Sequence, residues 1–135
     1  MIKQLSHVTI YVHDEDEALA FYTGQLGFEK RSDERWGEGN RWVTVAPPGA
    51  QTEVALLKPD PIGMGLDAAT RAESEIGRQS FWVFGCDDLQ ATFKQLSDRG
   101  VHFTQPPEKQ PWGGMMAQFR DLYGNVFALT EIGQG

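Results

Sequence analysis

Histidine and glutamate are the residue types in this chain best suited to proton transfer or metal binding, and one of each lies in a strand-like run. His7 begins the apolar run 7–12, and Glu53 lies in the run Thr52–Lys58. Imidazole titrates near neutral pH, and imidazole and carboxylate groups both bind divalent metals. Two such ligands are too few for tight metal binding without help from a substrate. His7 therefore has two interpretations, as part of a site or as a hydrogen-bonded side chain that lines a cavity.

Tryptophan is the second residue type that points to ligand binding, with 4 copies among 135 residues. Trp36 and Trp112 lie in glycine-rich segments predicted to be loops, Trp42 opens a predicted strand, and Trp82 is predicted to lie in the core. Indole rings at the mouth of a cavity can stack on planar or cationic ligands. They can equally anchor a dimer interface or cover one end of a core, and both interpretations stay open.

The cysteine and the other two histidines are predicted to have no role in a site. Cys86 is the only cysteine, which excludes an internal disulfide, and its apolar surroundings predict a buried, unreactive thiol. His13 follows a strand and is predicted to be an exposed loop residue. His102 lies in a short strand without an acidic neighbour and is predicted to lie on the surface.

The charge and the hydropathy pattern limit the class of partner. The net charge is −7 and the pI is near 4.8, which argues against nucleic acid and anionic membranes as partners. No apolar run approaches the roughly 20 residues needed to cross a bilayer. The N-terminus lacks the layout of a signal peptide. We therefore expect a cytoplasmic protein with a small-molecule ligand.

Two copies of one βαβββ unit hold these candidate residues. Residues 7–26 align with residues 81–100, because each segment contains an apolar run, an acidic pair or cluster and then apolar residues at helical spacing. Two capping pairs, Asp14 with Glu17 and Asp87 with Gln90, are predicted to begin the helices, and Gly27 and Gly100 to end them. The strands predicted after the helices are Phe28–Arg31, Arg41–Ala46 and Thr52–Lys58, then Val101–Thr104, Met115–Arg120 and Asn125–Glu131.

This repeat predicts one domain, residues 1–135, made of two modules at about 1–58 and 79–135. The linker, 59–78, contains a possible short helix at 67–74. Alternation in the first strand of each module separates a core side from a more polar side that faces a cavity. The cavity-facing candidates for ligand binding are His7, Tyr11, Trp36, Trp42, Glu53, Phe81, Trp112 and Thr130.

Six short motifs occur in a characteristic order: Leu5–Val12, Ala20–Tyr22, Leu26–Phe28, Asp87–Leu89, Pro111–Gly114 and Phe119–Asn125. In this order they resemble the vicinal-oxygen-chelate superfamily, which includes glyoxalases, bleomycin-resistance-type proteins, extradiol dioxygenases and fosfomycin-resistance enzymes. The resemblance covers essentially the whole chain. It implies an α+β fold whose tandem βαβββ repeats form curved mixed sheets around a cavity, usually completed by a homodimer.

The resemblance also implies four positions for metal ligands, because metal-dependent members take them from the first, fourth, fifth and eighth strands. Carried over residue by residue, the positions are His7, Ala55, Phe81 and Ala128. Only His7 can coordinate a metal ion. The sequence therefore predicts no cofactor, and it does not identify a catalytic residue. His7 and Glu53 are the candidate ligands if a divalent metal is bound after all.

Three functions remain compatible with the resemblance, since one fold hosts many activities. The leading hypothesis is a glyoxalase/bleomycin-resistance-type protein that binds a small molecule without a metal. The second is a divalent-metal enzyme, a lyase, isomerase or dioxygenase, that uses His7, Glu53 and further ligands. The third is a dimeric scaffold without activity.

Overall fold

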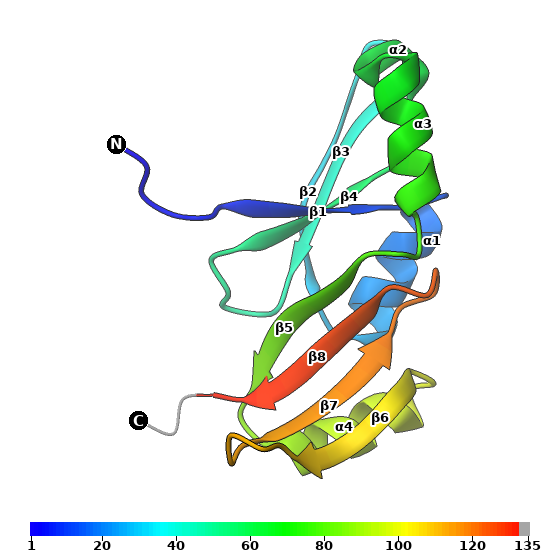
Figure 1. Ribbon diagram of the computed structural model, residues 1–135. Coiled ribbons are helices and arrows are strands. Elements are labelled where there is room, and N and C mark those ends of the chain that lie inside the picture. The colour runs from blue at the N-terminus through cyan, green and yellow to red at the C-terminus, as the bar shows by residue number, and fades with distance from the viewer. Residues whose placement is uncertain (133–135) are drawn as a thin grey trace. The chain divides into compact units, whose positions relative to one another are not determined.

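The computed structural model describes residues 1–132, apart from the side chains of residues 80 and 81. The chain folds into two compact units, Met1–Ile76 and Gly77–Gly135, which are described one at a time (Figure 1). Within the described residues, no helix is long and apolar enough to span a bilayer.

The first unit is a four-stranded mixed sheet with a helix between its first two strands in sequence. The strands lie in the order β1-β4-β3-β2, with β1 parallel to β4 and the other neighbours antiparallel. Its elements are β1 (His7–Tyr11), α1 (Glu15–Ala20), the π-helical turn η1 (Phe21–Gln25), β2 (Glu29–Trp36), β3 (Asn40–Ala46), β4 (Glu53–Leu57), α2 (Pro61–Met64) and α3 (Leu66–Glu75).

The second unit repeats this topology with one helix. Its strands lie in the order β5-β8-β7-β6, and β5 is parallel to β8. The elements are β5 (Ser80–Cys86), α4 (Leu89–Asp98), β6 (His102–Lys109), β7 (Met115–Arg120) and β8 (Val126–Glu131). The predicted α+β fold of tandem βαβββ repeats is confirmed.

Equivalent residues also pair in the same register in the two sheets. Thr9 lies opposite Ala55 between β1 and β4, and Val83 lies opposite Ala128 between β5 and β8. These are the residues that the alignment of the two copies equates. The strand phase read from the repeat therefore agrees with the hydrogen-bonded pairing.

Helices α1 and α4 begin at acidic caps, and the cap of α4 is displaced from its predicted position. The Asp14 carboxylate accepts a hydrogen bond from the Glu17 backbone N–H, as predicted. In the second unit the cap is Asp88, which accepts from the Ala91 N–H, and the prediction of Asp87 was wrong by one residue. Strand β5 pairs with β8 as far as Cys86, so the chain is still extended at Asp88 and the helix starts later.

Each sheet packs one face against its helix, and that face forms the core. In the first unit Ile10, Val12 and Tyr22 have no exposed surface. In the second unit the Phe127 ring is equally buried and contacts the rings of Trp82 and Phe84. The alternation in β1 and β5 assigned these strand residues to the core side, and their burial agrees with it.

Two strands are longer than the sequence predicted. Strand β2 continues to Trp36 instead of ending at Arg31, and β6 continues to Lys109 instead of Thr104. Both are edge strands of polar composition, and backbone pairing with β3 and β7 forms them without an apolar pattern. Trp36 is therefore the last residue of a strand and not a loop residue.

Candidate functional site

A polar cluster lies on the face of the first sheet that is opposite its helix, and its centre is the pair of His7 and Glu53. These residues lie side by side on the parallel strands β1 and β4. The Nε2 atom of His7 is 3.6 Å from Oε1 of Glu53, and its Nδ1 atom is 3.0 Å from the Ser6 hydroxyl. The predicted association of His7 with Glu53 is thus present in the structure.

Two neighbours that the sequence analysis missed hold the Glu53 carboxylate. The buried Thr44 hydroxyl donates to Oε1 at 2.7 Å, and Nη1 of Arg31 lies 3.8 Å from Oε2. Arg31 also donates to the carbonyls of Pro47 and Ala50. Thr44 follows Trp42 by two residues on β3, so strand alternation could have found it. Arg31 lies at a register shift between Lys30 and Ser32, which no sequence pattern announced.

Trp42 supplies an aromatic wall to the same cluster. The centroid of its indole lies 5.5 Å from that of the His7 ring, with the planes tilted by 58°. Tyr11, four residues after His7 on the same strand, alternates to the same face and is half-buried. The first unit therefore brings four of the predicted residues, His7, Tyr11, Trp42 and Glu53, onto one face of its sheet.

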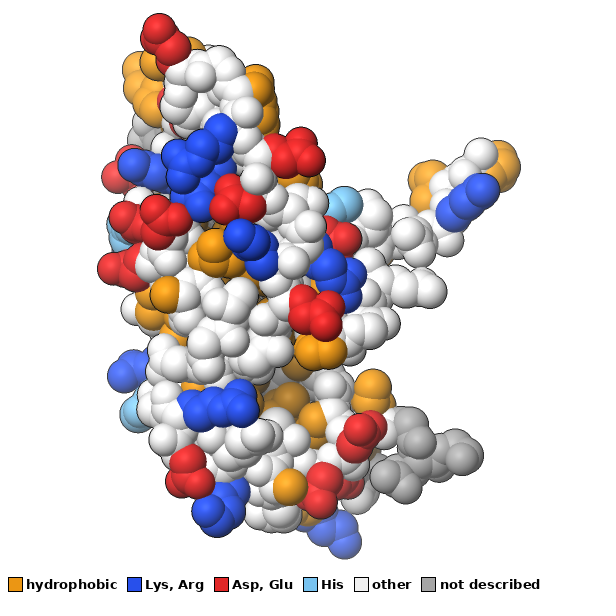
Figure 2. Space-filling model, turned by 180° about the vertical axis from the view of Figure 1, so that it is seen from behind, with side chains coloured by type: hydrophobic (Ala, Val, Ile, Leu, Met, Phe, Trp, Pro, Cys, Tyr) orange, Lys and Arg blue, Asp and Glu red, His pale blue; other side chains and the backbone are white. Residues whose placement is uncertain are grey.

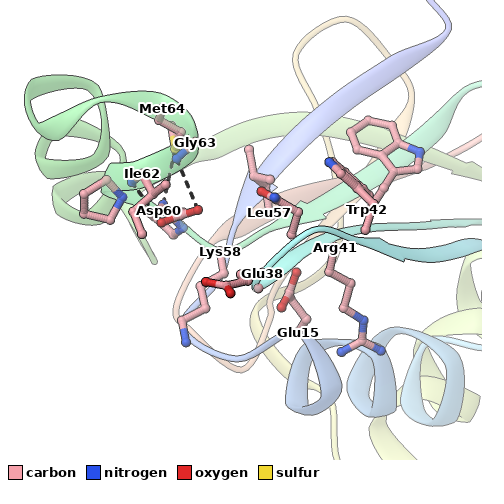
Figure 3. Close-up of a pocket in the computed structure, with 15 residues that line it drawn as sticks. Glu15, Glu38, Arg41, Trp42, Leu57, Lys58, Asp60, Ile62, Gly63 and Met64 are labelled. Carbon is pink, nitrogen blue, oxygen red and sulfur yellow. Dashed lines mark hydrogen bonds between the residues drawn. The ribbon is translucent and has the colours of Figure 1, made fainter.

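A pocket of about 530 Å³ lies at one end of the same sheet. Its walls come from α1, the hairpin between β2 and β3, the end of β4, and α2 (Figure 3). Trp36 and Trp42 both line it, but His7, Tyr11 and Glu53 do not. Trp42 therefore contributes both to the polar cluster and to the pocket, whereas Trp36 belongs to the pocket alone.

An arginine at the rim of the pocket ties the sheet to the helix. Arg41 donates from Nε and Nη2 to the two carboxylate oxygens of Asp33, each at 2.9 Å, and its Nη1 lies 2.9 Å from Asp16. Only 8% of its side chain is exposed. The hydrogen bond from Arg41 lowers the pKa of Asp33, and it raises the pKa of Arg41 itself.

Arg41→Gln is expected to lower the free energy of unfolding by about 2 kcal/mol at pH 7, because charge-assisted hydrogen bonds are lost. The lowered pKa of Asp33 stabilises the fold above the ordinary aspartate value and ceases to do so as the pH falls through the folded-state value. The gap between wild type and variant should therefore narrow below about pH 4. Urea unfolding at pH 7 and pH 3 measures it, with Lys94→Gln in an exposed pair as the control. An equal gap at both pH values would contradict this account.

In the second unit the predicted residues come from three different segments, β5, β8 and the β6–β7 turn. Thr130 is half-buried on β8 opposite Gly85. Trp112, 67% exposed, lies in the β6–β7 turn and covers Gly114 with its ring. The side chain of Phe81 lies outside the described residues. Cys86 is half-buried, and burial raises the pKa of its thiol, as suits an unreactive cysteine.

Alanine side chains occupy the two strand positions at which the resemblance implied further metal ligands. Ala55 is 1% exposed and Ala128 is 5% exposed. Among the side chains that the structure describes, no three His, Cys, Asp or Glu residues lie close enough to hold one ion.

Acidic and basic side chains are interspersed on the face shown in Figure 2, so the negative net charge is not gathered into one patch there.

Fold, repeat register and site together identify the class of protein. The chain belongs to the Glyoxalase/Bleomycin resistance protein/Dioxygenase superfamily, whose model matches residues 4–129. Among solved structures, UcmS2 is 39% identical with a TM-score of 0.82, and the alignment covers 96% of this chain and 98% of that one. TnmS3, described as an antibiotic binding protein from Streptomyces sp. CB03234, is 30% identical with a TM-score of 0.79, covering 98% of each chain. The uncharacterized protein YetH of Bacillus subtilis (strain 168) is 36% identical over 97% of this chain and its own full length.

Proposed function

We propose that this protein binds a small organic molecule reversibly, without a metal ion and without changing the ligand chemically. The observation that carries the proposal is the state of the Glu53 carboxylate. It already accepts the Thr44 hydroxyl at 2.7 Å and lies 3.8 Å from the Arg31 guanidinium. A divalent cation at His7 and Glu53 would meet the positive charge of Arg31, which opposes its binding.

The alanines support the same proposal. A protein site for a divalent metal usually supplies three or four nitrogen, oxygen or sulfur ligands. Ala55 and Ala128 supply none, and each is buried against its sheet. His7 and Glu53 alone do not complete a coordination shell. His7, Glu53 and the two alanines therefore do not fit a resident metal centre.

The polar cluster is instead suited to holding an organic ligand. A typical ligand site combines aromatic and aliphatic walls with a few polar groups that fix orientation. Trp42 and Tyr11 provide the walls, and His7, which is partly exposed, provides a group that can donate or accept a hydrogen bond. TnmS3, which shares 30% of its residues with this chain, is described as an antibiotic binding protein. The proposal extends that kind of function to this chain, acting as a homodimer.

A thermal-shift screen of the full chain tests the proposal. A ligand that binds only the folded state at 100 times its Kd stabilises it by about 2.7 kcal/mol, or roughly 10 °C in Tm for a chain of this size. We expect such a shift from at least one member of a panel of planar aromatic antibiotics and aromatic acids. We expect less than about 1 °C from Ni²⁺, Zn²⁺, Mn²⁺ or Fe²⁺ after treatment with chelator.

Two variants test whether the ligand binds at the polar cluster, and metal measurements distinguish the binding protein from the metal-dependent enzyme. His7→Ala is expected to keep the wild-type Tm without ligand, because the side chain is partly exposed, and to lose most of the ligand-induced shift. His102→Ala, on an exposed residue of β6, is the matched control. Stoichiometric metal in the purified protein, or a metal-induced shift abolished by His7→Ala, would favour the metal-dependent enzyme instead.

A further inference from the structure

The pocket at the end of the first sheet has the size of a ligand site. Its volume of about 530 Å³ falls within the roughly 300–1,000 Å³ of pockets that take drug-sized molecules. Every residue that lines it belongs to the first unit. It therefore exists without any contribution from the second unit or from another chain.

One side of this pocket is aromatic and aliphatic. Trp36 ends β2 and is 55% exposed, which leaves its indole accessible to a ligand. Trp42, Leu57 and Met64 add apolar surface from β3, β4 and α2 (Figure 3). Indole faces stack on planar rings and attract cations through their quadrupole.

The charged side chains of the pocket favour a positive ligand. Its acids are Glu15, Glu38 and Asp60, and its bases are Arg41 and Lys58. Arg41 is already bound by Asp33 and Asp16, two carboxylates outside the pocket lining, so it adds no uncompensated positive charge. Asp60 is engaged by the N–H groups of Ile62 and Gly63 at the start of α2. Glu15 and Glu38 thus remain as the carboxylates for a ligand, with Lys58 as the competing cation.

Glu15 is half-buried in the pocket wall, whereas Glu38 is exposed, so Glu15 is the less solvated of these two acids. Burial raises its pKa, although the nearby charges of Arg41, Lys58 and Arg35 lower it. The carboxylate is therefore desolvated more than its neighbours compensate. A ligand ammonium group beside it would favour the charged form and would regain the electrostatic energy that burial removes.

We propose that this pocket binds a planar aromatic ring that carries a positively charged nitrogen, with the ring against Trp36 and Trp42 and the nitrogen beside Glu15. The inference goes beyond the proposed function, because it adds a second place for non-catalytic binding with its own ligand class. It differs in location, since the pocket excludes His7 and Glu53. An anionic ring would meet Glu15 and Glu38 and should bind poorly.

Proflavine, a planar tricyclic cation with intrinsic fluorescence, is a direct probe. Fluorescence anisotropy of proflavine with the full chain should show saturable binding, and acridone, a neutral ring system of similar shape, should bind roughly tenfold more weakly. Trp36→Leu should weaken proflavine binding roughly tenfold by removing the stacking surface. Glu15→Gln should weaken proflavine by a similar factor while leaving acridone unchanged, because only the charge is removed.

Matched variants and a second readout keep the test decisive. Ile132→Ala replaces an exposed apolar side chain of the second unit, and Glu73→Gln replaces an exposed acid of α3, so neither should alter proflavine binding. Circular dichroism melts confirm that each variant is folded. If the Kd for proflavine is unchanged in Trp36→Leu and Glu15→Gln but binding is lost in His7→Ala, this inference is overturned and the proposed function stands. Absence of any proflavine binding would overturn the inference as well. The proposed function fails only if no compound of the organic panel raises the Tm.

Discussion

Phe127→Ala is expected to lower the free energy of unfolding of the second unit by about 3–5 kcal/mol, a large part of the stability of a small domain. The Phe127 ring has no exposed surface and lies at the centre of an aromatic cluster. Its centroid is 5.9 Å from Trp82, 5.4 Å from Phe84 and 5.7 Å from Phe119. Removal of the ring leaves a cavity that three rigid rings cannot close, so the contacts are lost outright.

Urea unfolding followed by tryptophan fluorescence measures this effect, because Trp82 reports directly on the cluster. Phe127→Leu, which keeps most of the volume, should cost much less than the alanine variant. Phe103→Ala, on a ring at the edge of the same cluster that is only half-buried, should fall between them. A loss below about 1 kcal/mol in Phe127→Ala would mean that the cluster is not packed as described.

Asn125→Ala is expected to lower the free energy of unfolding by about 3 kcal/mol, because it removes two side-chain hydrogen bonds of a buried network, one of them to a carboxylate. The Asn125 amide donates to Oδ2 of Asp121 at 2.8 Å and accepts from the Gln79 N–H at 2.9 Å. Asn125 has no exposed surface and Asp121 is 4% exposed. Alanine can neither donate to Asp121 nor accept from the Gln79 N–H, so the Asp121 carboxylate loses a buried donor.

The position of this hydrogen-bond network determines which strands should lose stability in Asn125→Ala. Gln79 immediately precedes β5, and Asp121 and Asn125 bracket the turn between β7 and β8, so the amide joins the start of one strand to the turn before its parallel partner. Relative to wild type, amide hydrogen exchange in Asn125→Ala should be faster in β5 and β8 by a larger factor than in β6. Gln95→Ala, on an exposed residue of α4, should change the unfolding free energy by less than about 0.5 kcal/mol. Wild-type exchange in β5 of the Asn125→Ala variant would contradict the role given to Asn125.

The repeat explains why so much of the fold could be predicted. Strand phase and helix start are local properties, and two copies of a local pattern constrain each other. The comparison equated Ala55 with Ala128, and the structure pairs these residues with Thr9 and Val83, which the comparison also equates. The error at Asp87 has the same local origin, since two adjacent aspartates offer two caps and only the extent of β5 selects Asp88.

Edge strands and the π-helical turn were beyond such reasoning. Residues 32–36, Ser-Asp-Glu-Arg-Trp, have no apolar alternation, and they form a strand because β3 offers backbone partners. The turn η1 at Phe21–Gln25 interrupts a helix whose sequence spacing is ordinary. Both features depend on what lies beside the segment, which the segment itself does not encode.

The residues that first suggested chemistry, His7 and Glu53, show where the sequence ends and the tertiary structure begins. The sequence by itself determined which side chains within each strand share a face, because side-chain direction in a strand follows its period of two. The resemblance to the family implied that alanines stand at two of its ligand positions. The sequence could not determine that Arg31, at a bulge on an edge strand, pairs with Glu53, or that Trp36 and Glu15 line one pocket. The first contact joins strands β2 and β4, and the second brings the end of β2 beside the start of α1. Only the folded chain decides them, because its long-range contacts bring together residues that no local pattern connects.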